Sequence, residues 1–237
     1  MVNIERSYPE PEALAEEKKK VNGKPNETTI LERLQTDFKN KCYICEQTSL
    51  ASGITVEHFV PHRNNKELKF QWENLFFSCS HCNSVKSIKY NTNDDNEILN
   101  CTNPNHDVVR WIKYEYDISY KCSVKLTADG IDKEYKKVID NTVKLLTEVY
   151  CGNLSTQKSK TANLKLEAAN LRKSLENNLI CFEMSLQEYE QSMYFDEKKQ
   201  CIKKIITELK KDSAFTAFKR WIIMKSKYRL IFEDYFD

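Results

Sequence analysis

The sequence is poor in the two residues that most often interrupt regular structure, with 4 glycines and 5 prolines among 237 residues. This scarcity disfavours a fold of many short strands joined by tight turns. No apolar run approaches the roughly 20 residues that a membrane-spanning helix needs. The formal net charge is only +2. It neither requires nor excludes an anionic partner, because only the contact surface of a nucleic-acid-binding protein has to be basic.

A secretory leader is also missing from the first residues, where no basic segment followed by an apolar run is present. The 9 cysteines therefore favour a reducing compartment, in which closely spaced cysteines bind metals more often than they form disulfides. From these absences we expect a cytoplasmic protein with no membrane partner.

The first part of the chain, residues 1–40, is predicted to be an N-terminal segment followed by a helix. Its beginning is polar, and is either a solvated leader or a short helix that ends at Lys18–Lys20 with the charge order that suits a helix dipole. Apolar residues on one face predict a helix over 26–40, and Asn26 is the candidate N-cap.

The rest of the chain is predicted to form two lobes, a small mixed lobe over 41–128 and a mainly helical lobe over 129–237, which gives an α+β fold. Aromatic and β-branched residues predict strands at 111–119 and 121–127, after an Asn-rich loop and before a turn at Ala128–Gly130. Beyond that turn, apolar residues recur at helical spacing in four stripes, which begin near Tyr135, Leu164, Cys201 and Phe215.

The end of the helical lobe is rich in aromatic residues, which are enriched where proteins meet partners. This lobe is therefore a candidate docking surface, although packing within its own core is the simpler explanation. The aromatic residues are Trp221, Tyr228, Phe232, Tyr235 and Phe236.

Four cysteines form two CxxC pairs, Cys42 with Cys45 and Cys79 with Cys82. Two thiolates separated by two residues can turn toward one ion, and two such pairs complete a tetrahedral zinc site with four sulfur ligands. A structural zinc contributes roughly 10–16 kcal/mol of apparent folding free energy, which suits a lobe with little core of its own. A redox-active CxxC and chance burial of thiols are the alternatives, and His81 could replace one thiolate as a ligand.

A second set of chemical groups lies between and just after the cysteine pairs. A β-like run ends in Glu57 and His58, and Asn83 directly follows the second pair. His58 is suited to take a proton from water, and Glu57 and Asn83 offer hard oxygen ligands for Mg²⁺ or Mn²⁺. Because a strand alternates its faces, Glu57 and His58 can share a site only if the strand ends or twists there, which Pro61 makes plausible.

Basic residues surround this motif, and each is either a phosphate contact or part of a solvated face. The candidates for nucleic-acid contact are His62, Lys86 and Lys89, in a segment that also contains Arg63, Lys66 and Lys69.

The order of these residues over 42–86 resembles the HNH endonuclease family, whose members carry a ββα-metal fold, often framed by two CxxC pairs. The resemblance implies a metal-dependent nuclease in which His58 is the general base and Glu57 and Asn83 bind the catalytic ion. It also implies that Asn74 has a structural role, fixing the imidazole through a nearby backbone carbonyl. The third motif position is Asn83 rather than histidine, so the chain would be an HNN variant.

The whole chain resembles the small PtuB-like HNH proteins of Septu-type and retron-associated anti-phage systems. The resemblance is carried by Asn3–Arg6, Ala15–Lys18, the EHFVPH form of the motif, Trp72–Leu75 and the long helical tail. It implies a bacterial defence effector that cuts nucleic acid, with DNA as the expected substrate, and that docks on an SMC/ABC-like ATPase. In the retron case, a reverse transcriptase with its RNA and DNA would be a further partner. A catalytically inactive, zinc-stabilised binding subunit is the alternative.

Overall fold

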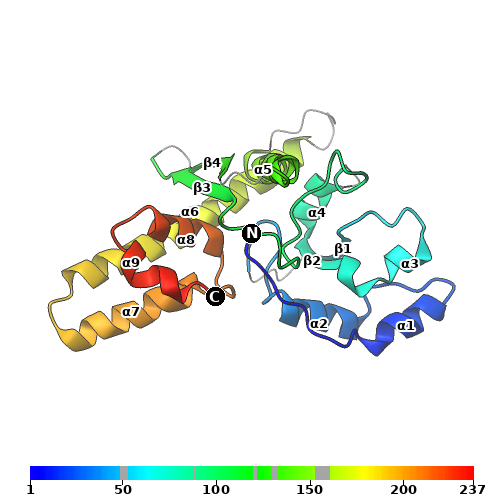
Figure 1. Cartoon of the computed structure of the whole chain (residues 1–237), viewed down its shortest axis with the longest axis horizontal. Helices are drawn as coiled ribbons and strands as arrows, with labels where there is room; N and C mark the ends of the chain where they lie inside the picture. The colour runs from blue at the N-terminus through cyan, green and yellow to red at the C-terminus, as the bar shows by residue number, and fades with distance from the viewer. Residues whose placement is uncertain (49–52, 88, 120–121, 130–132, 153–160) are drawn as a thin grey trace.

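The computed structural model describes residues 1–48, 53–87, 89–119, 122–129, 133–152 and 161–237. The chain is α+β, with helices that carry most of the regular structure and two antiparallel two-stranded sheets, as predicted. Figure 1 shows two groups of elements that meet near the chain ends. One group contains α1 to α4 with β1 and β2, and the other contains α7, α8 and α9.

The first segment contains two helices, α1 (Glu12–Lys19) and α2 (Thr28–Asp37). Of the two alternatives for the leader, the structure therefore has the short helix. The predicted cap of α2 was wrong by one residue. The side chain of Glu27, not of Asn26, accepts a hydrogen bond from the backbone nitrogen of Thr29 at 2.9 Å, which satisfies one of the free N–H groups at the helix start.

The strands β1 (Ile54–His58) and β2 (Leu75–Cys79) form an antiparallel pair in which His58 lies opposite Leu75. Helix α4 (Ser80–Lys86) begins at the residue after β2, which completes a ββα unit. The connection between the strands contains the short helix α3 (Lys66–Lys69) and the 3₁₀ turn η1 (Trp72–Asn74). All five residues of β2 are buried, because α2 covers the pair.

The second sheet pairs β3 (Ile112–Asp117) with β4 (Ser123–Ala128). Strand β3 lies within the predicted range 111–119, and β4 begins within the predicted range 121–127 but ends one residue beyond it, at Ala128. Residue 121 of the second range falls outside the described part of the chain. The same holds for Gly130 in the predicted turn. Helix α5 (Lys136–Cys151) packs against β4 and carries the first of the four predicted apolar stripes.

The other three stripes lie on α6 (Thr161–Gln191), α7 (Phe195–Leu209) and α8 (Thr216–Met224), before the short α9 (Arg229–Phe232) and the 3₁₀ turn η2 (Glu233–Tyr235). Of the terminal aromatic residues, Trp221 and Phe232 are buried in the core, whereas Tyr235 is 47% exposed. No helix of the described residues is long and apolar enough to cross a membrane.

The buried apolar side chains form two clusters. The larger one joins both cysteine pairs and β2 to α5, the first half of α6 and α8, so it extends across the predicted boundary at residue 128. That boundary stays a prediction. The smaller cluster lies between the second half of α6, α7, α8 and α9. We call residues 41–90 the knuckle lobe. We call α7, α9, the chain from Phe182 to α7 and the end of α8 from Ile223 onward the helical arm.

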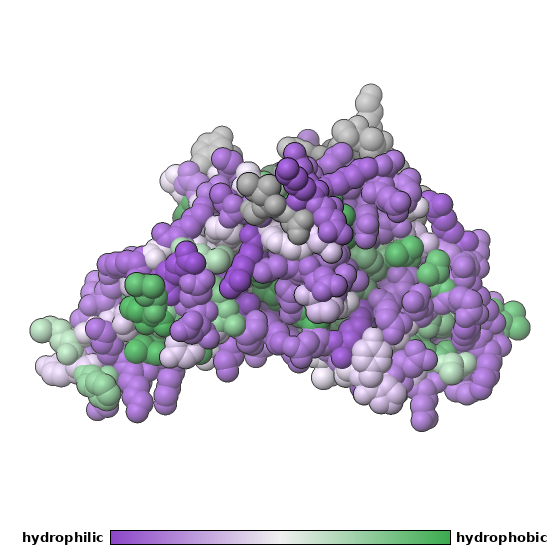
Figure 2. All heavy atoms as spheres, in the orientation of Figure 1, coloured by the Kyte–Doolittle hydropathy of each residue, from purple (hydrophilic) through white to green (hydrophobic). Residues whose placement is uncertain are grey.

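Hydrophilic residues cover most of the face in Figure 2, and smaller hydrophobic groups appear on both sides, including the left, over the helical arm. The most exposed apolar side chains of the arm are Met193, Phe195 and Leu230, at 92%, 80% and 95% exposure.

Candidate functional site

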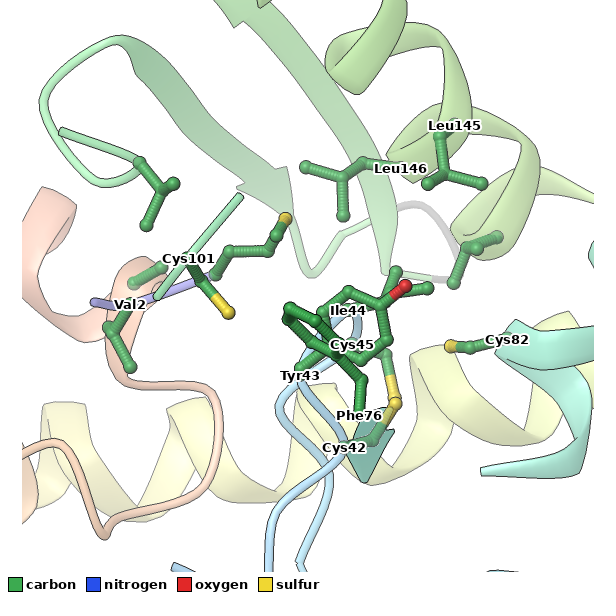
Figure 3. Close-up of a cluster of buried hydrophobic side chains, with 14 of the residues drawn as sticks. Val2, Cys42, Tyr43, Ile44, Cys45, Phe76, Cys82, Cys101, Leu145 and Leu146 are labelled. Atoms are coloured by element: carbon green, nitrogen blue, oxygen red, sulfur yellow. The ribbon is translucent and has the colours of Figure 1, made fainter. Parts of the chain in front are cut away.

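The side chains of the two CxxC pairs meet in the interior of the knuckle lobe. The sulfur atoms of Cys42, Cys45, Cys79 and Cys82 all lie within 4.8 Å of one another, and the Sγ atoms of Cys45 and Cys79 are 3.9 Å apart. A tetrahedral ion with zinc–sulfur bonds of about 2.3 Å separates its sulfurs by about 3.8 Å. Figure 3 shows the labelled Cys42, Cys45 and Cys82 at the edge of the apolar cluster. The group can therefore bind a zinc ion.

The surroundings of these thiols also favour a cation. Burial raises the pKa of the Cys82 thiol well above its usual value, and a bound metal ion would hold this sulfur as a thiolate. The Sγ of Cys79 already accepts a hydrogen bond from the backbone nitrogen of Cys82 at 3.4 Å. This contact caps α4 and points a helix N–H group at the sulfur.

His81 lies within the second pair but is held away from the sulfurs. Its Nδ1 lies 2.9 Å from Oε2 of Glu167 on α6, and its Nε2 lies 2.9 Å from the backbone oxygen of Val149 on α5. Both ring nitrogens are therefore occupied, and the cluster is completed by sulfur alone.

An open cleft of about 490 Å³ lies where β1 ends, beside α4. It brings Glu57, His58 and Asn83 together, as predicted from the sequence, and His62 joins them. Asn74 is buried and does not line the cleft. The remaining lining residues are Pro61, Arg63, Asn64, Ser84 and Ser87.

Glu57 and His58 can share the cleft because the strand ends at His58 and the backbone turns directly after it. The backbone nitrogen of Phe59 donates to the backbone oxygen of Asn74 at 2.9 Å. The Nζ of Lys86 donates to the backbone oxygens of His58 and Phe59 at 3.0 and 2.9 Å. The first contact continues the β1–β2 register by one residue pair, and the Lys86 contacts hold the two carbonyls where the backbone bends at residues 59–60, so both side chains reach the cleft at the end of the strand.

The orientation of His58 identifies the nitrogen that can accept a proton. Its Nε2 lies 3.0 Å from the backbone oxygen of Lys69. A carbonyl oxygen can only accept, so Nε2 carries the ring proton and Nδ1 is left as the acceptor. Burial lowers the pKa of the imidazole, which favours the neutral ring that a general base requires.

Asn74 holds the loop that supplies this carbonyl. Its Oδ1 accepts a hydrogen bond from the nitrogen of Val60 at 2.7 Å, and its Nδ2 donates to the oxygens of Val60 and Leu68 at 2.9 and 3.0 Å. Since Leu68 directly precedes Lys69, the Asn74 amide fixes the position of the backbone that orients His58. The structural role of Asn74 in the site stays a prediction.

Asn83 is oriented by a residue of β1. Its Nδ2 lies 3.1 Å from Oγ1 of Thr55, whose own hydroxyl lies 3.4 Å from the backbone oxygen of Ser78. The Thr55 hydroxyl donates to that carbonyl, so a lone pair faces Asn83 and requires the amide nitrogen on that side. The Oδ1 of Asn83 has no hydrogen-bond partner among the described residues and is available as an oxygen ligand.

Glu57 is buried, and both of its oxygens have partners. The Tyr43 hydroxyl donates to Oε2 at 2.7 Å, and the Lys86 ammonium lies 2.7 Å from Oε1. Burial raises the pKa of Glu57, and the neighbouring Lys86 charge opposes that rise. Each carboxylate oxygen keeps a second lone pair, so a cation in the cleft would share Glu57 with Lys86.

The structure contradicts one of the three predicted nucleic-acid contacts and pairs another with a carboxylate. Lys86 is 0% exposed, and its ammonium is bonded to Glu57 and to two backbone oxygens, so a phosphate cannot reach it. The Nζ of Lys89 lies 2.6 Å from Oε1 of Glu148, which neutralises its charge. His62 does line the cleft.

Sequence reasoning missed two residues that position the site, Tyr43 and Thr55. Thr55 lies two residues before Glu57 on β1 and so shares its strand face, and this spacing could have identified it. Tyr43 gave no such signal, because a tyrosine inside a cysteine pair is equally well explained by packing.

Residues 42–89 match the family model of HNH endonucleases. This segment is an HNH endonuclease domain. It contains both cysteine pairs and every residue of the cleft, and it implies nuclease activity on nucleic acid. No curated protein and no solved structure matches the chain, so the family assignment applies to these residues and not to the helical arm.

Proposed function

We propose that the chain is a metal-dependent endonuclease that hydrolyses phosphodiester bonds, with DNA as the preferred substrate. The observation that carries this proposal is the meeting of Glu57, His58 and Asn83 in one open cleft, with Nδ1 of His58 left as a proton acceptor. A carboxylate, an amide oxygen and a neutral imidazole are the groups that this hydrolysis requires.

In this mechanism, Nδ1 of His58 takes a proton from the attacking water, and the Lys69 carbonyl stabilises the resulting imidazolium through Nε2–H. Glu57 and Asn83 would hold the divalent ion, since they offer a carboxylate and an unpartnered amide oxygen. When bound, that ion supplies neutralisation of the phosphate and of the leaving oxygen. Asn74 and Thr55 act on His58 and Asn83 by positioning them.

The test is cleavage of plasmid DNA by the full chain with Mg²⁺ or Mn²⁺, compared with the His58→Ala variant. We expect His58→Ala to lose at least about 100-fold in rate, the usual contribution of a general base. Zinc content and the far-UV circular dichroism spectrum should stay unchanged, which shows that the loss is chemical. Equal cleavage by both proteins would reject His58 as the base.

A second candidate function is an inactive, zinc-stabilised binding subunit. The observation in its favour is that Glu57 is already bonded to Tyr43 and Lys86, which reduces its freedom to coordinate an ion. This alternative predicts that the wild-type chain binds nucleic acid but cleaves neither DNA nor RNA with any divalent metal.

We also propose that the nuclease is the effector subunit of a bacterial anti-phage system of the Septu or retron type, controlled by an SMC/ABC-like ATPase. The support is the resemblance of the whole chain to PtuB-like proteins. An apolar surface on the helical arm, where Met193, Phe195 and Leu230 are exposed, adds a candidate contact. The test is purification from the native host. An ATPase that co-purifies supports the proposal, a reverse transcriptase with its RNA indicates the retron form, and a nuclease that purifies alone rejects both.

A further inference from the structure

We propose that His62 and Arg63 form the phosphate-binding side of the cleft, and that Lys86 and Lys89 take no part in it. The ligand is a phosphodiester oxygen of the nucleic-acid backbone. This inference rests on the proposed nuclease function and names the residues that hold its substrate.

The first observation is the hydrogen bonding of His62. Its Nδ1 lies 3.2 Å from the backbone nitrogen of Asn64. A backbone N–H can only donate, so Nδ1 is the acceptor and the ring proton is on Nε2. Nε2 has no partner among the described residues. His62 therefore presents a hydrogen-bond donor in a cleft that it lines.

The second observation is that His58 and His62 have opposite hydrogen-bonding roles. The ring centroids are 4.5 Å apart. In the His58 ring, Nε2–H donates a hydrogen bond to the Lys69 carbonyl, and Nδ1 remains free as an acceptor. In the His62 ring, Nδ1 accepts a hydrogen bond from the Asn64 nitrogen, and Nε2–H remains free as a donor. A phosphate oxygen bound to the donor ring would lie beside the ring that activates water. Neither ring could exchange roles without breaking its backbone contact.

The third observation is the free charge of Arg63. Among the cleft-lining residues that the structure describes, Arg63 is the one with a full positive charge, and it is exposed with no ion pair. The cation nearest to the carboxylate of the cleft, Lys86, is already neutralised by Glu57. An arginine whose guanidinium lies in solvent can form bidentate hydrogen bonds with two phosphate oxygens.

The backbone around Arg63 is arranged to present this side chain. Arg63 and Asn64 both have left-handed backbone conformations, with φ of 44° and 65°, which arginine rarely adopts. The nitrogen of Asn65 donates to the oxygen of His62 at 2.7 Å, and the Asn65 side chain caps α3. The turn is therefore fixed at both ends, and His62 and Arg63 keep their positions at the cleft.

The test measures binding rather than cleavage. The full chain carrying His58→Ala is titrated into a short fluorescent DNA duplex and into a single strand, with zinc retained and no other divalent ion added. The affinity is followed from about 50 to about 200 mM KCl, because each phosphate contact of a cation changes the slope of log K against log salt by about 0.9 for duplex DNA. Far-UV circular dichroism confirms that each variant is folded.

We expect Arg63→Ala to weaken binding about fivefold to tenfold at the lowest salt and to reduce the salt slope by about one. His62→Ala should weaken binding about threefold with an unchanged slope, since it removes a neutral donor. His62→Gln, whose amide nitrogen can stand near the Nε2 position, should restore affinity. Lys89→Ala is the matched control and should leave both quantities at the value of the His58→Ala parent, because Glu148 already pairs with Lys89.

The proposal is overturned if Arg63→Ala leaves the slope unchanged, if Lys89→Ala lowers it as much, or if the chain binds neither oligonucleotide. Failure of the nuclease function gives a different result. An Arg63-dependent slope in a wild-type chain that never cuts would reject the nuclease and retain the phosphate site. If the chain cleaves DNA equally well without Arg63, and Arg63→Ala leaves the salt slope unchanged, the nuclease function is retained and the phosphate site is rejected.

Discussion

The knuckle lobe and the helical arm are built in different ways. In the knuckle lobe, charged and polar side chains such as Glu57, Asn74 and Lys86 are buried beside four clustered cysteines. The core of the arm is apolar and consists of Phe182, Leu186, Ile205, Leu209, Ile223 and Phe232. The structure of the lobe depends on buried hydrogen bonds and ion pairs, which tolerate few replacements. The structure of the arm depends on the area and shape of its apolar side chains.

This difference predicts how each region responds to substitution. A buried polar group that loses its partner keeps its full desolvation cost, so single changes in the knuckle lobe should have large effects. An apolar core loses stability in proportion to the volume removed, so changes in the arm should be graded and should leave the cleft intact.

Removal of a zinc ligand should have the largest effect. Cys82→Ser should abolish stable folding of the knuckle lobe, since a structural zinc contributes about 10–16 kcal/mol. Hydrogen exchange followed by mass spectrometry should show loss of protection over β2 and α4 while α7 stays protected. The exposed Cys181 supplies the control, because Cys181→Ser should change neither zinc content nor exchange. Full protection from hydrogen exchange in zinc-free Cys82→Ser would show that the cysteine cluster does not hold the knuckle lobe together.

The next effect concerns two lysines that lie three residues apart. Lys86→Met leaves the buried Glu57 carboxylate without its cation and should cost about 3–5 kcal/mol. Lys89→Met removes a partly exposed pair, with 45% of the Lys89 side chain accessible, and should cost no more than about 1 kcal/mol. Urea unfolding with zinc present measures both. Similar losses for the two variants would contradict the assignment of Lys86 as the partner that holds Glu57.

The smallest expected effect is in the arm. Ile205 is fully buried in the second cluster, and Ile205→Val should lower the free energy of unfolding by about 1 kcal/mol. Plasmid cleavage and zinc content should not change. Lys203→Ala, on an exposed position of the same helix, should stay within about 0.5 kcal/mol of wild type. Loss of cleavage in Ile205→Val would mean that the arm and the cleft are energetically coupled.

The sequence predicted those features that depend on local spacing. The CxxC pairs identified the cysteine cluster, and apolar stripes identified α5 to α8, because these signals repeat within a few residues. The contact between Glu57 and Lys86 joins residues 29 positions apart, and no periodicity reveals which of several lysines becomes buried. The cap of α2 was misplaced because Asn26 and Glu27 are adjacent and either side chain can accept a backbone N–H group.

The orientations of Asn83 and His58 were also beyond sequence reasoning. They depend on the Thr55 hydroxyl and the Lys69 carbonyl, and any residue can supply a carbonyl. The family resemblance pointed to Glu57, His58 and Asn83, which line one cleft, but it could not indicate that Lys86 lies inside the fold rather than on its surface.

The hydrogen bonds of His81 connect the cysteine cluster to α5 and α6. One imidazole ties α4 to Glu167 on α6 and to the end of α5, and Cys82 and Asn83 are the next two residues of α4. Helix α6 is also the longest helix in the described structure and continues into the arm. A rotation of α6 would therefore be transmitted to α4, where Cys82 belongs to the cysteine cluster and Asn83 lines the cleft.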